Sequence, residues 1–239
     1  MKLIILAGGL GTRISEETDY IPKPMVKIGK RPILWHIIKY YSVFGFSEFI
    51  ICGGYKVNII KNYFKNYKKK LNNLWSVKII NTGMNSNTGE RLKRVKKYVG
   101  STFCLTYGDG LCNVNINNLI NFHKKNKLIA TLTTVKPIPH FGKIFFKGNK
   151  VIKFFEKEKK KENWINGGFF VCEKKIFKYL NKKNSILEID ALNSLARRRE
   201  LAAYRHNDFW YCMDTLRDKR YLNNLWLSKK APWKIWNDE

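Results

Sequence analysis

Short apolar runs alternate with segments of helical character through the first half of the chain, and this order constrains the fold more than any other feature. The predicted strands cover residues 2–8, 48–55, 76–83 and 102–110. The predicted helices between them cover residues 32–45, 58–69 and 89–99. In the first helix, apolar positions recur every three and four residues between Pro32 and Gly45. The alternation predicts an α/β protein with a doubly wound, largely parallel sheet.

The pattern changes beyond residue 130. Shorter strands and hairpins are predicted at 130–136, 142–156 and 166–173, and helices near 176–181, 187–199 and 216–228. No internal repeat and no Pro-rich or Gly/Ser-rich linker divides the 239 residues. We therefore expect one domain over residues 1–239, in which a mixed-sheet second half covers a substrate held by the first half.

Several function classes are excluded by the distribution of special residues. No apolar run reaches the roughly 18 residues of a membrane-spanning helix, so no membrane association is expected. The five cysteines and the four histidines show no disulfide or metal-ligand spacing. The cysteines are Cys52, Cys104, Cys112, Cys172 and Cys212. We expect them to be buried apolar side chains of a reduced, cytoplasmic protein, and we assign no metal to a histidine.

The chain is strongly basic, with 46 Lys and Arg against 18 Asp and Glu and a formal net charge of +28. Its lysines are spread along the whole length and gather only locally, which is typical of solvated helix faces and loops. Sequence-independent nucleic-acid binding is therefore not the expected function. The positive field would still attract polyphosphate substrates.

The sequence LAGGLGTRI, residues 6–14, places three glycines and an arginine at the end of the first predicted strand. A Walker A loop is excluded because Thr12 and Arg13 follow Gly11 where Lys and Ser or Thr are needed. A dinucleotide fingerprint fails because its third glycine would fall at Ile14. Two interpretations remain open, a plain turn and a loop whose backbone N–H groups ring an anion beside Arg13.

Further charged candidates lie near other strand ends. Lys23 stands between two prolines, which predicts an extended, stiff segment that holds its ammonium in place. Asp109 follows a predicted strand in YGDG, and Asp214 follows another apolar run in YCMDT. Two carboxylates suffice for Mg²⁺ when phosphates and water supply its other ligands. Asp218 is expected to be a charge on the surface of a helix.

Eight segments in register resemble the cytidylyltransferases of the sugar-nucleotidyltransferase family. They are LAGGLGTRISEET, PKPM, PILWHIIKYYS, TGERLKRV, TYGDG, NGGFFV, FWYCMDTLRDK and KAPWKIW, and they span nearly the whole chain. The resemblance implies a Rossmann-like fold with a mixed, mainly parallel central sheet. It also implies a nucleotide-binding N-terminal half and a sugar-phosphate-binding C-terminal half.

The reaction that the resemblance implies is transfer of CMP from CTP to glucose 1-phosphate, giving CDP-glucose and pyrophosphate for deoxysugars of surface polysaccharides. Mg²⁺ is the implied cofactor, held by Asp109 and Asp214, with Arg13 and Lys23 as the catalytic cations. The implied nucleotide-binding residues are Leu6, Ala7, Gly8, Gly9, Gly11, Thr12, Arg13, Lys23, Thr88, Gly89, Arg91 and Asp109. The implied sugar-phosphate-binding residues are Glu156, Lys157, Asn166, Gly167 and Glu188.

Three departures from the family pattern leave alternatives open. Glu90 replaces a glycine, and it either accepts from the cytosine amino group or faces solvent. Glu158 replaces a proline, which leaves another sugar phosphate or a phosphonate as acceptor. The link at residues 68–76 is shorter than in typical relatives, so a homo-oligomer is possible but not predicted. A different nucleotide and a non-catalytic nucleotide-binding homologue are the remaining alternatives.

Overall fold

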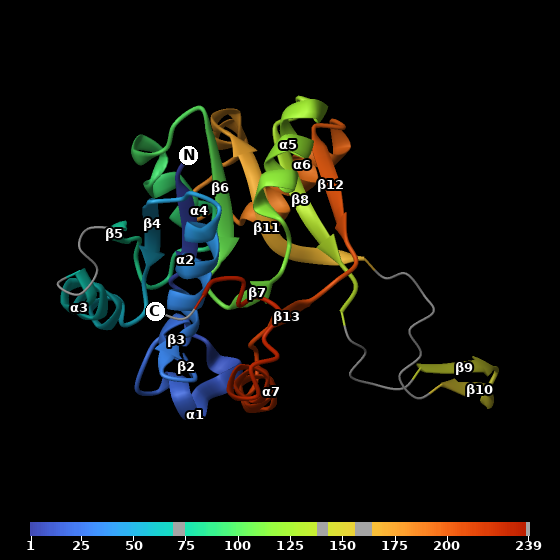
Figure 1. Ribbon diagram of the computed structural model, residues 1–239. Helices are drawn as coiled ribbons and strands as arrows, with labels where there is room; N and C mark the ends of the chain where they lie inside the picture. Colours follow the sequence, from blue (N-terminus) through green and yellow to red (C-terminus); the bar gives the residue numbers. More distant parts are fainter. Residues whose placement is uncertain (69–74, 138–142, 156–163, 238–239) are drawn as a thin grey trace.

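A seven-stranded mixed sheet forms the centre of the computed structural model, which describes residues 1–68, 75–137, 143–155 and 164–237 (Figure 1). From edge to edge its strands are β12 (Leu201–His206), β8 (Ala130–Val135), β11 (Ile165–Glu173), β6 (Thr102–Tyr107), β1 (Leu3–Ala7), β4 (Glu48–Gly53) and β5 (Ser76–Asn81). Only β11 runs antiparallel to its neighbours β6 and β8. The expected mixed, mainly parallel α/β sheet is confirmed.

Helices cover both faces of the sheet. On one face lie α2 (Ile33–Val43), α3 (Val57–Lys68) and α5 (Ile116–Asn126). On the other lie α4 (Thr88–Arg94), the 3₁₀ helix η4 (Lys174–Tyr179), the π-helical turn η5 (Leu187–Leu192) and α6 (Asn193–Arg197). No helix in the described ranges is long and apolar enough to cross a membrane.

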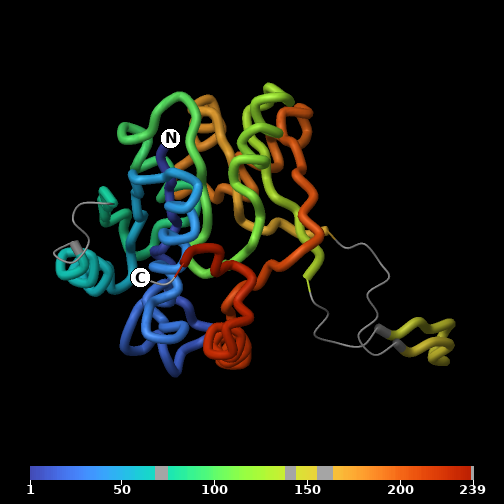
Figure 2. Tube along the Cα trace, in the orientation of Figure 1, coloured from blue at the N-terminus to red at the C-terminus, as the bar shows by residue number. Residues whose placement is uncertain are grey.

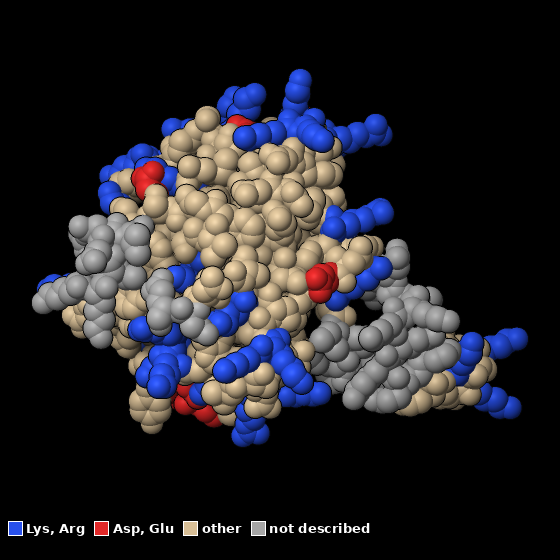
Figure 3. All heavy atoms as spheres, in the orientation of Figure 1, with Lys and Arg blue, Asp and Glu red and all other residues tan. Residues whose placement is uncertain are grey.

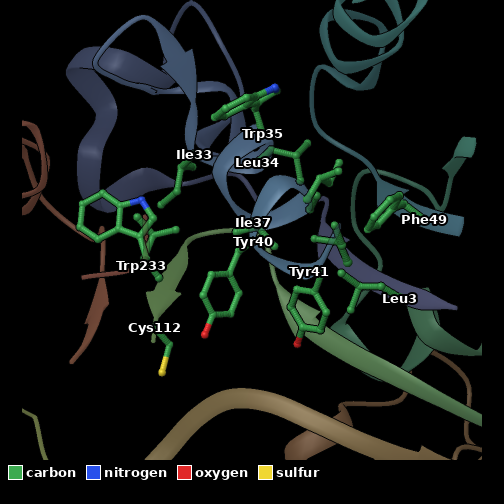
Figure 4. Packing of buried hydrophobic residues seen from close by; sticks show 14 of the residues in the cluster. Leu3, Ile33, Leu34, Trp35, Ile37, Tyr40, Tyr41, Phe49, Cys112 and Trp233 are labelled. Carbon is green, nitrogen blue, oxygen red and sulfur yellow. The ribbon is translucent and has the colours of Figure 1, made fainter. Parts of the chain in front are cut away.

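β1 shows why the first apolar run lacks an alternating pattern. Leu3 and Ile5 pack into the core beneath α2, whereas Ile4 and Leu6 pack into the core beneath α4. All four are at most 7% exposed. A parallel strand covered on both faces needs apolar residues at every position. Figure 4 shows Leu3 and Phe49 of the sheet facing Leu34, Tyr41 and other side chains of α2.

Several smaller elements complete the described part of the chain. They are the 3₁₀ turns η1 (Thr12–Ile14), η2 (Lys23–Met25) and η3 (Lys96–Tyr98), the short helix α1 (Ser15–Thr18), the ribbons β2 (Lys27–Ile28) with β3 (Arg31–Pro32) and β7 (Gly110–Cys112) with β13 (Trp210–Cys212), and α7 (Leu216–Leu227). The hairpin of β9 (Lys143–Lys147) and β10 (Lys150–Phe155) stands away from the sheet in Figure 2.

Several element predictions are corrected. The helix expected at residues 176–181 is the 3₁₀ helix η4, and that expected at 187–199 begins as the π-helical turn η5. The helix expected at 89–99 ends at Arg94, where the chain continues into η3. Neither α5 nor β12 is among the predicted elements. α5 is rich in asparagine, a weak helix former, and is capped by Asn115, whose side chain accepts from the Asn118 amide at 3.0 Å.

The prediction that the cysteines are buried apolar side chains is confirmed for four of the five. All five cysteines are free, and four are buried, with Cys212 half-buried. Burial lowers the pKa of His36 to about 4, so this imidazole is neutral between α2 and the aromatic C-terminal segment. Among the described residues, a single group of His, Cys, Asp or Glu side chains lies close enough to share a metal ion, and it contains no histidine.

Candidate active site

A hollow of about 580 Å³ opens at the carboxyl ends of β1 and β6, where ligands bind in doubly wound sheets. Eleven of the twelve predicted nucleotide-binding residues line it: Leu6, Ala7, Gly8, Gly9, Gly11, Thr12, Arg13, Lys23, Thr88, Arg91 and Asp109. Asp214, Asn166 and Gly167 also line it. The predicted site residues from both halves of the chain therefore meet at one hollow.

The glycines of the first loop have different surroundings. A Cβ on Gly9 would meet nothing within 4 Å, so this part of the loop is open to an incoming group. Gly11 has φ +72°, a left-handed conformation that favours glycine. Its carbonyl accepts from the Ile14 amide at 3.0 Å and from the Thr18 hydroxyl at 3.1 Å. Hydrogen bonds thus fix the loop at Gly11, whereas the backbone at Gly9 remains accessible to a ligand.

Two aspartates and two cations meet at the rim of the hollow. Lys23 Nζ donates to Asp109 Oδ2 at 2.6 Å and to Asp214 Oδ1 at 2.5 Å. Arg13 Nη1 donates to the other oxygen of Asp214 at 2.8 Å. Lys23 is 8% exposed, whereas the side chain of Arg13 is 73% exposed. The buried ammonium is therefore fixed, and the guanidinium can swing toward a bound anion.

The ribbon of β7 and β13 explains how aspartates 105 residues apart come together. Gly110, next to Asp109, pairs with Cys212, and the Met213 amide donates to the Asp109 carbonyl at 2.9 Å. The chain reaches Asp214 one residue later. The backbone pairing of β7 with β13 thus brings both carboxylates beside Lys23.

The carboxylates around Lys23 change its pKa, and its backbone conformation differs from the predicted one. Burial lowers its pKa, but the carboxylates of Asp109 and Asp214 outweigh this effect, so that the pKa is raised above its ordinary value. The extended segment expected around Lys23 is wrong, because Lys23–Met25 form the 3₁₀ turn η2. A 3₁₀ turn tolerates Pro24 near its start, since the proline φ fits and no donor is needed there.

Asp218 corrects another prediction, because it is 6% exposed and not a surface charge. Its carboxylate accepts from the amides of Asp214 and Thr215 at 3.0 and 2.8 Å, and from the Tyr211 hydroxyl at 3.0 Å. Together with the Thr215 side chain it forms the capping box of α7. This carboxylate therefore holds the backbone of Asp214 in place.

We expect Asp218→Ala to lower the free energy of unfolding by about 2–4 kcal/mol, because a cap is lost and buried donors are left without acceptors. Urea unfolding followed by circular dichroism measures this effect. Arg217→Ala, an exposed position in the same helical turn, is the control and should stay within about 0.5 kcal/mol of the unaltered chain. Equal stability of the two variants would contradict the role given to Asp218.

The predicted base-side residues divide into two groups. Thr88 lines the hollow, and its hydroxyl donates to Glu188 Oε2 at 2.6 Å. Gly89 does not line the hollow, and its assignment as a nucleotide contact stays a prediction. A Cβ there would come within 2.8 Å of Leu180 and the Ser185 carbonyl, so Gly89 permits close packing of α4 on the segment before η5.

Arg91 lies in the wall of the hollow but is only 4% exposed. Its guanidinium donates to four backbone carbonyls and to one threonine hydroxyl. With both terminal nitrogens engaged in this way, the structure gives Arg91 a positioning geometry instead of the predicted base contact. Glu90 pairs with Lys93 and Arg94 at 2.8 and 3.0 Å and is absent from the lining of the hollow.

A polar chain runs along the sugar side of the hollow. The Tyr107 hydroxyl donates to Glu188 and accepts from Asn166 Nδ2 at 3.2 Å. Asn166 Oδ1 in turn accepts from the Gly168 amide at 2.8 Å. Burial raises the pKa of Tyr107, so its hydroxyl stays protonated and serves as a donor. Glu188 itself is not among the lining residues and acts on the site through Thr88 and Tyr107.

Glu156, Lys157 and Glu158 lie outside the described residues, as does most of the short link at 68–76. Sequence reasoning missed Tyr107 and Trp210, both of which line the hollow. Trp210 Nε1 donates to the Gly167 carbonyl at 2.7 Å. Their positions in the sequence could have identified them, because Tyr107 precedes the GDG turn and Trp210 lies in the apolar run that leads to Asp214.

The residues at the rim fit a divalent cation. One ligand atom each from Asp109, Asp214 and Cys212 lies within 4.8 Å of the others. The two carboxylates suit Mg²⁺, whereas the thiol is a poor ligand for so hard an ion. Burial and the neighbouring Asp109 raise the pKa of Cys212, which keeps this thiol protonated. The pair Asp109 and Asp214 is therefore the part of the group that suits Mg²⁺.

The excess positive charge does not collect at one place on the face shown in Figure 3. Lys and Arg side chains extend from its top to its bottom edge, with few Asp or Glu between them. Such a distribution raises the potential broadly and attracts polyphosphates from several directions.

Comparison with known proteins assigns the whole chain to one family. The family model described as nucleotidyl transferase matches residues 2–238. The chain is 46% identical to the glucose-1-phosphate cytidylyltransferase of Salmonella typhimurium over 256 aligned positions, covering 99% of this chain and 100% of that protein. It is 40% identical to the probable glucose-1-phosphate cytidylyltransferase of Bacillus subtilis, with the same coverage.

Solved structures agree on the fold. A putative glucose-1-phosphate thymidylyltransferase from Bacillus anthracis superposes with a TM-score of 0.75 at 19% identity, covering 100% of this chain and 98% of the other. HddC from Yersinia pseudotuberculosis superposes with a TM-score of 0.71 at 24% identity, covering 94% and 99%. At these identities the likeness concerns the fold.

Proposed function

Because the chain belongs to the nucleotidyl transferase family, we propose that it transfers CMP from CTP to glucose 1-phosphate, giving CDP-glucose and pyrophosphate. The observation that carries the reaction type is the cluster of Lys23, Arg13 and the paired carboxylates at the open glycine loop. The names of relatives that are 46% and 40% identical over the full length support the choice of reactants.

In the proposed step, an oxygen of glucose 1-phosphate forms a bond to the α-phosphorus of CTP. The bond from that phosphorus to the oxygen bridging the α- and β-phosphates breaks, and pyrophosphate leaves with its electron pair. The attacking oxygen is already anionic, so no general base is required. Positioning and charge neutralisation carry such a reaction.

The residues at the rim divide this work. The backbone around Gly9 receives the triphosphate, and Arg13, the exposed cation, follows the charge onto the departing pyrophosphate. Asp109 and Asp214 would hold Mg²⁺, which would supply charge that neutralises the reacting phosphates. The Lys23 ammonium, released from one carboxylate, then donates to an α-phosphate oxygen.

The acceptor side uses the polar chain from Glu188 through Tyr107 to Asn166. Tyr107 and Asn166, which line the hollow, would face the sugar hydroxyls, and Glu188 holds Tyr107 so that its ring borders the hollow. Glu90, which departs from the family pattern, pairs with Lys93 and Arg94 outside this lining. That position supports an unaltered choice of base.

The supply of surface-polysaccharide deoxysugars remains a prediction from the family resemblance, a cytoplasmic location remains a prediction from the cysteine pattern, and the oligomeric state is not predicted. None of the three enters the argument for the reaction.

Product analysis tests the proposal. The purified protein with Mg²⁺, CTP and glucose 1-phosphate should form CDP-glucose and pyrophosphate in equal amounts, detected by phosphorus NMR and mass spectrometry. Galactose 1-phosphate and mannose 1-phosphate are the matched acceptors. Preferred use of either one would replace glucose in the proposal, and CMP and pyrophosphate without a sugar product would show hydrolysis in place of transfer.

A further inference from the structure

Arg91 joins three separate strand-end loops at a point beneath the glycine loop. Its Nη2 donates to the Gly8 carbonyl at 2.8 Å and to the Met84 carbonyl at 3.0 Å. Its Nη1 donates to the Gly83 carbonyl at 2.7 Å and to the Thr82 hydroxyl at 3.0 Å. These acceptors follow β1 and β5, and a longer contact of 3.4 Å reaches the Gly53 carbonyl at the end of β4.

Glycines surround the guanidinium because no side chain fits beside it. A Cβ on Gly8 would lie 2.1 Å from Arg91 Nη1, and a Cβ on Gly54 would lie 2.3 Å from the same atom. Gly8 is buried, whereas Gly9 faces open space. The first glycine of the loop therefore makes room for an arginine, and the next one makes room for a ligand.

The contacts are those expected of a planar donor group. A guanidinium presents several N–H groups in a fixed fork, and it can bridge carbonyls from different segments in a way that a lysine ammonium on a flexible stem cannot. Loss of Arg91 would remove the donor to the Gly83 and Met84 carbonyls, whereas the Gly8 carbonyl would keep the Tyr55 amide at 3.2 Å. Arg91 is thus the side chain that ties the glycine loop at Gly8 to the loop after β5.

We infer that Arg91 is a positioning residue, which sets the affinity for the triphosphate by fixing the glycine loop to the loops that follow β4 and β5. The inference rests on the proposed function for the identity of the triphosphate. The loop after β5 also supplies Ser86 and Asn87 to the hollow. Arg91 thereby fixes the distance between the glycine loop, on the phosphate side of the site, and the loop after β5, on its base side.

The test compares Arg91→Lys and Arg91→Ala with Arg94→Lys, an arginine on the same helix that does not contact Gly8. We expect the Arg91 variants to raise the KM for CTP by about tenfold to a hundredfold, while the KM for glucose 1-phosphate changes by less than about twofold. Guanidinium chloride, at concentrations far below those that unfold proteins, should partly restore Arg91→Ala. An unchanged KM for CTP, or equal rises for both substrates, would overturn the inference.

Amide hydrogen exchange of the free protein gives a readout that needs no turnover. Exchange in the peptide that spans residues 5–14 should become faster in the Arg91 variants and stay unchanged in Arg94→Lys. Unchanged exchange in a folded Arg91→Lys protein would refute the inference that Arg91 fixes the glycine loop. If the unaltered protein releases no pyrophosphate from CTP, the proposed function fails, and the exchange result still decides whether Arg91 holds the loop.

Substitution of Gly8 gives a second test of the contact between Arg91 and the glycine loop. Gly8→Ala should displace the guanidinium and reproduce the higher KM for CTP. Adding Arg91→Ala to Gly8→Ala should then have little further effect, because both changes remove one interaction. Additive effects would mean that Gly8 and Arg91 act independently, against the inference.

Discussion

Asp109→Asn is expected to lower kcat by about 10²- to 10³-fold, the largest effect that we predict for a single substitution. The amide keeps the shape of the carboxylate but loses the charge that holds Lys23 at 2.6 Å and that forms half of the proposed Mg²⁺ site. Pyrophosphate release at saturating CTP and glucose 1-phosphate measures the loss.

Asp208→Asn is the matched control, since Asp208 is an exposed aspartate close to β13 that does not line the hollow. Its kcat should equal that of the unaltered protein. Thermal unfolding of both variants separates a catalytic loss from misfolding. A folded Asp109→Asn protein with full turnover would show that this carboxylate has no part in the reaction.

Lys23→Met is expected to lower kcat by a similar factor of about 10², because a fixed cation no longer faces the α-phosphate. The substitution has a second consequence in the absence of nucleotide. Asp109 and Asp214 would lose the ammonium that now neutralises both of them. Mg²⁺ would no longer compete with that ammonium for the carboxylates.

Mg²⁺ should therefore raise the melting temperature of Lys23→Met more than that of the unaltered chain, by the usual linkage of ligand binding to stability. Lys219→Met serves as the control, because that lysine pairs with Glu17 away from the two aspartates. A smaller Mg²⁺ effect in Lys23→Met would contradict a shared site for the ammonium and the metal ion.

The sequence was sufficient to predict the features that depend on local pattern. The strand at residues 2–8 and the helix at 32–45 appear as β1 and α2, because their residues are buried as their patterns require. The position of Asp109 and Asp214 at strand ends predicted their meeting, which the pairing of β7 with β13 brings about. Such predictions need one segment and its periodicity.

Features that depend on tertiary contacts were not predicted. The insertion of antiparallel β11 between β6 and β8 leaves no mark in the β11 sequence itself. Asp218 is buried because the donors of Tyr211, Asp214 and Thr215 converge on it. Arg91 was expected to contact the base, but three loops from distant parts of the sequence supply acceptors for it. The sequence of residues 88–94 contains no pattern that predicts the acceptors of Arg91.

The most direct test of the central claim is pyrophosphate release with Mg²⁺ and each of CTP, UTP, dTTP, ATP and GTP, with and without glucose 1-phosphate. The account predicts release that requires both CTP and glucose 1-phosphate, with the other four nucleotides much slower. Sugar-dependent release with a different nucleotide would contradict the base assignment. Absence of release with every pair, in a folded protein that binds CTP, would contradict catalysis itself.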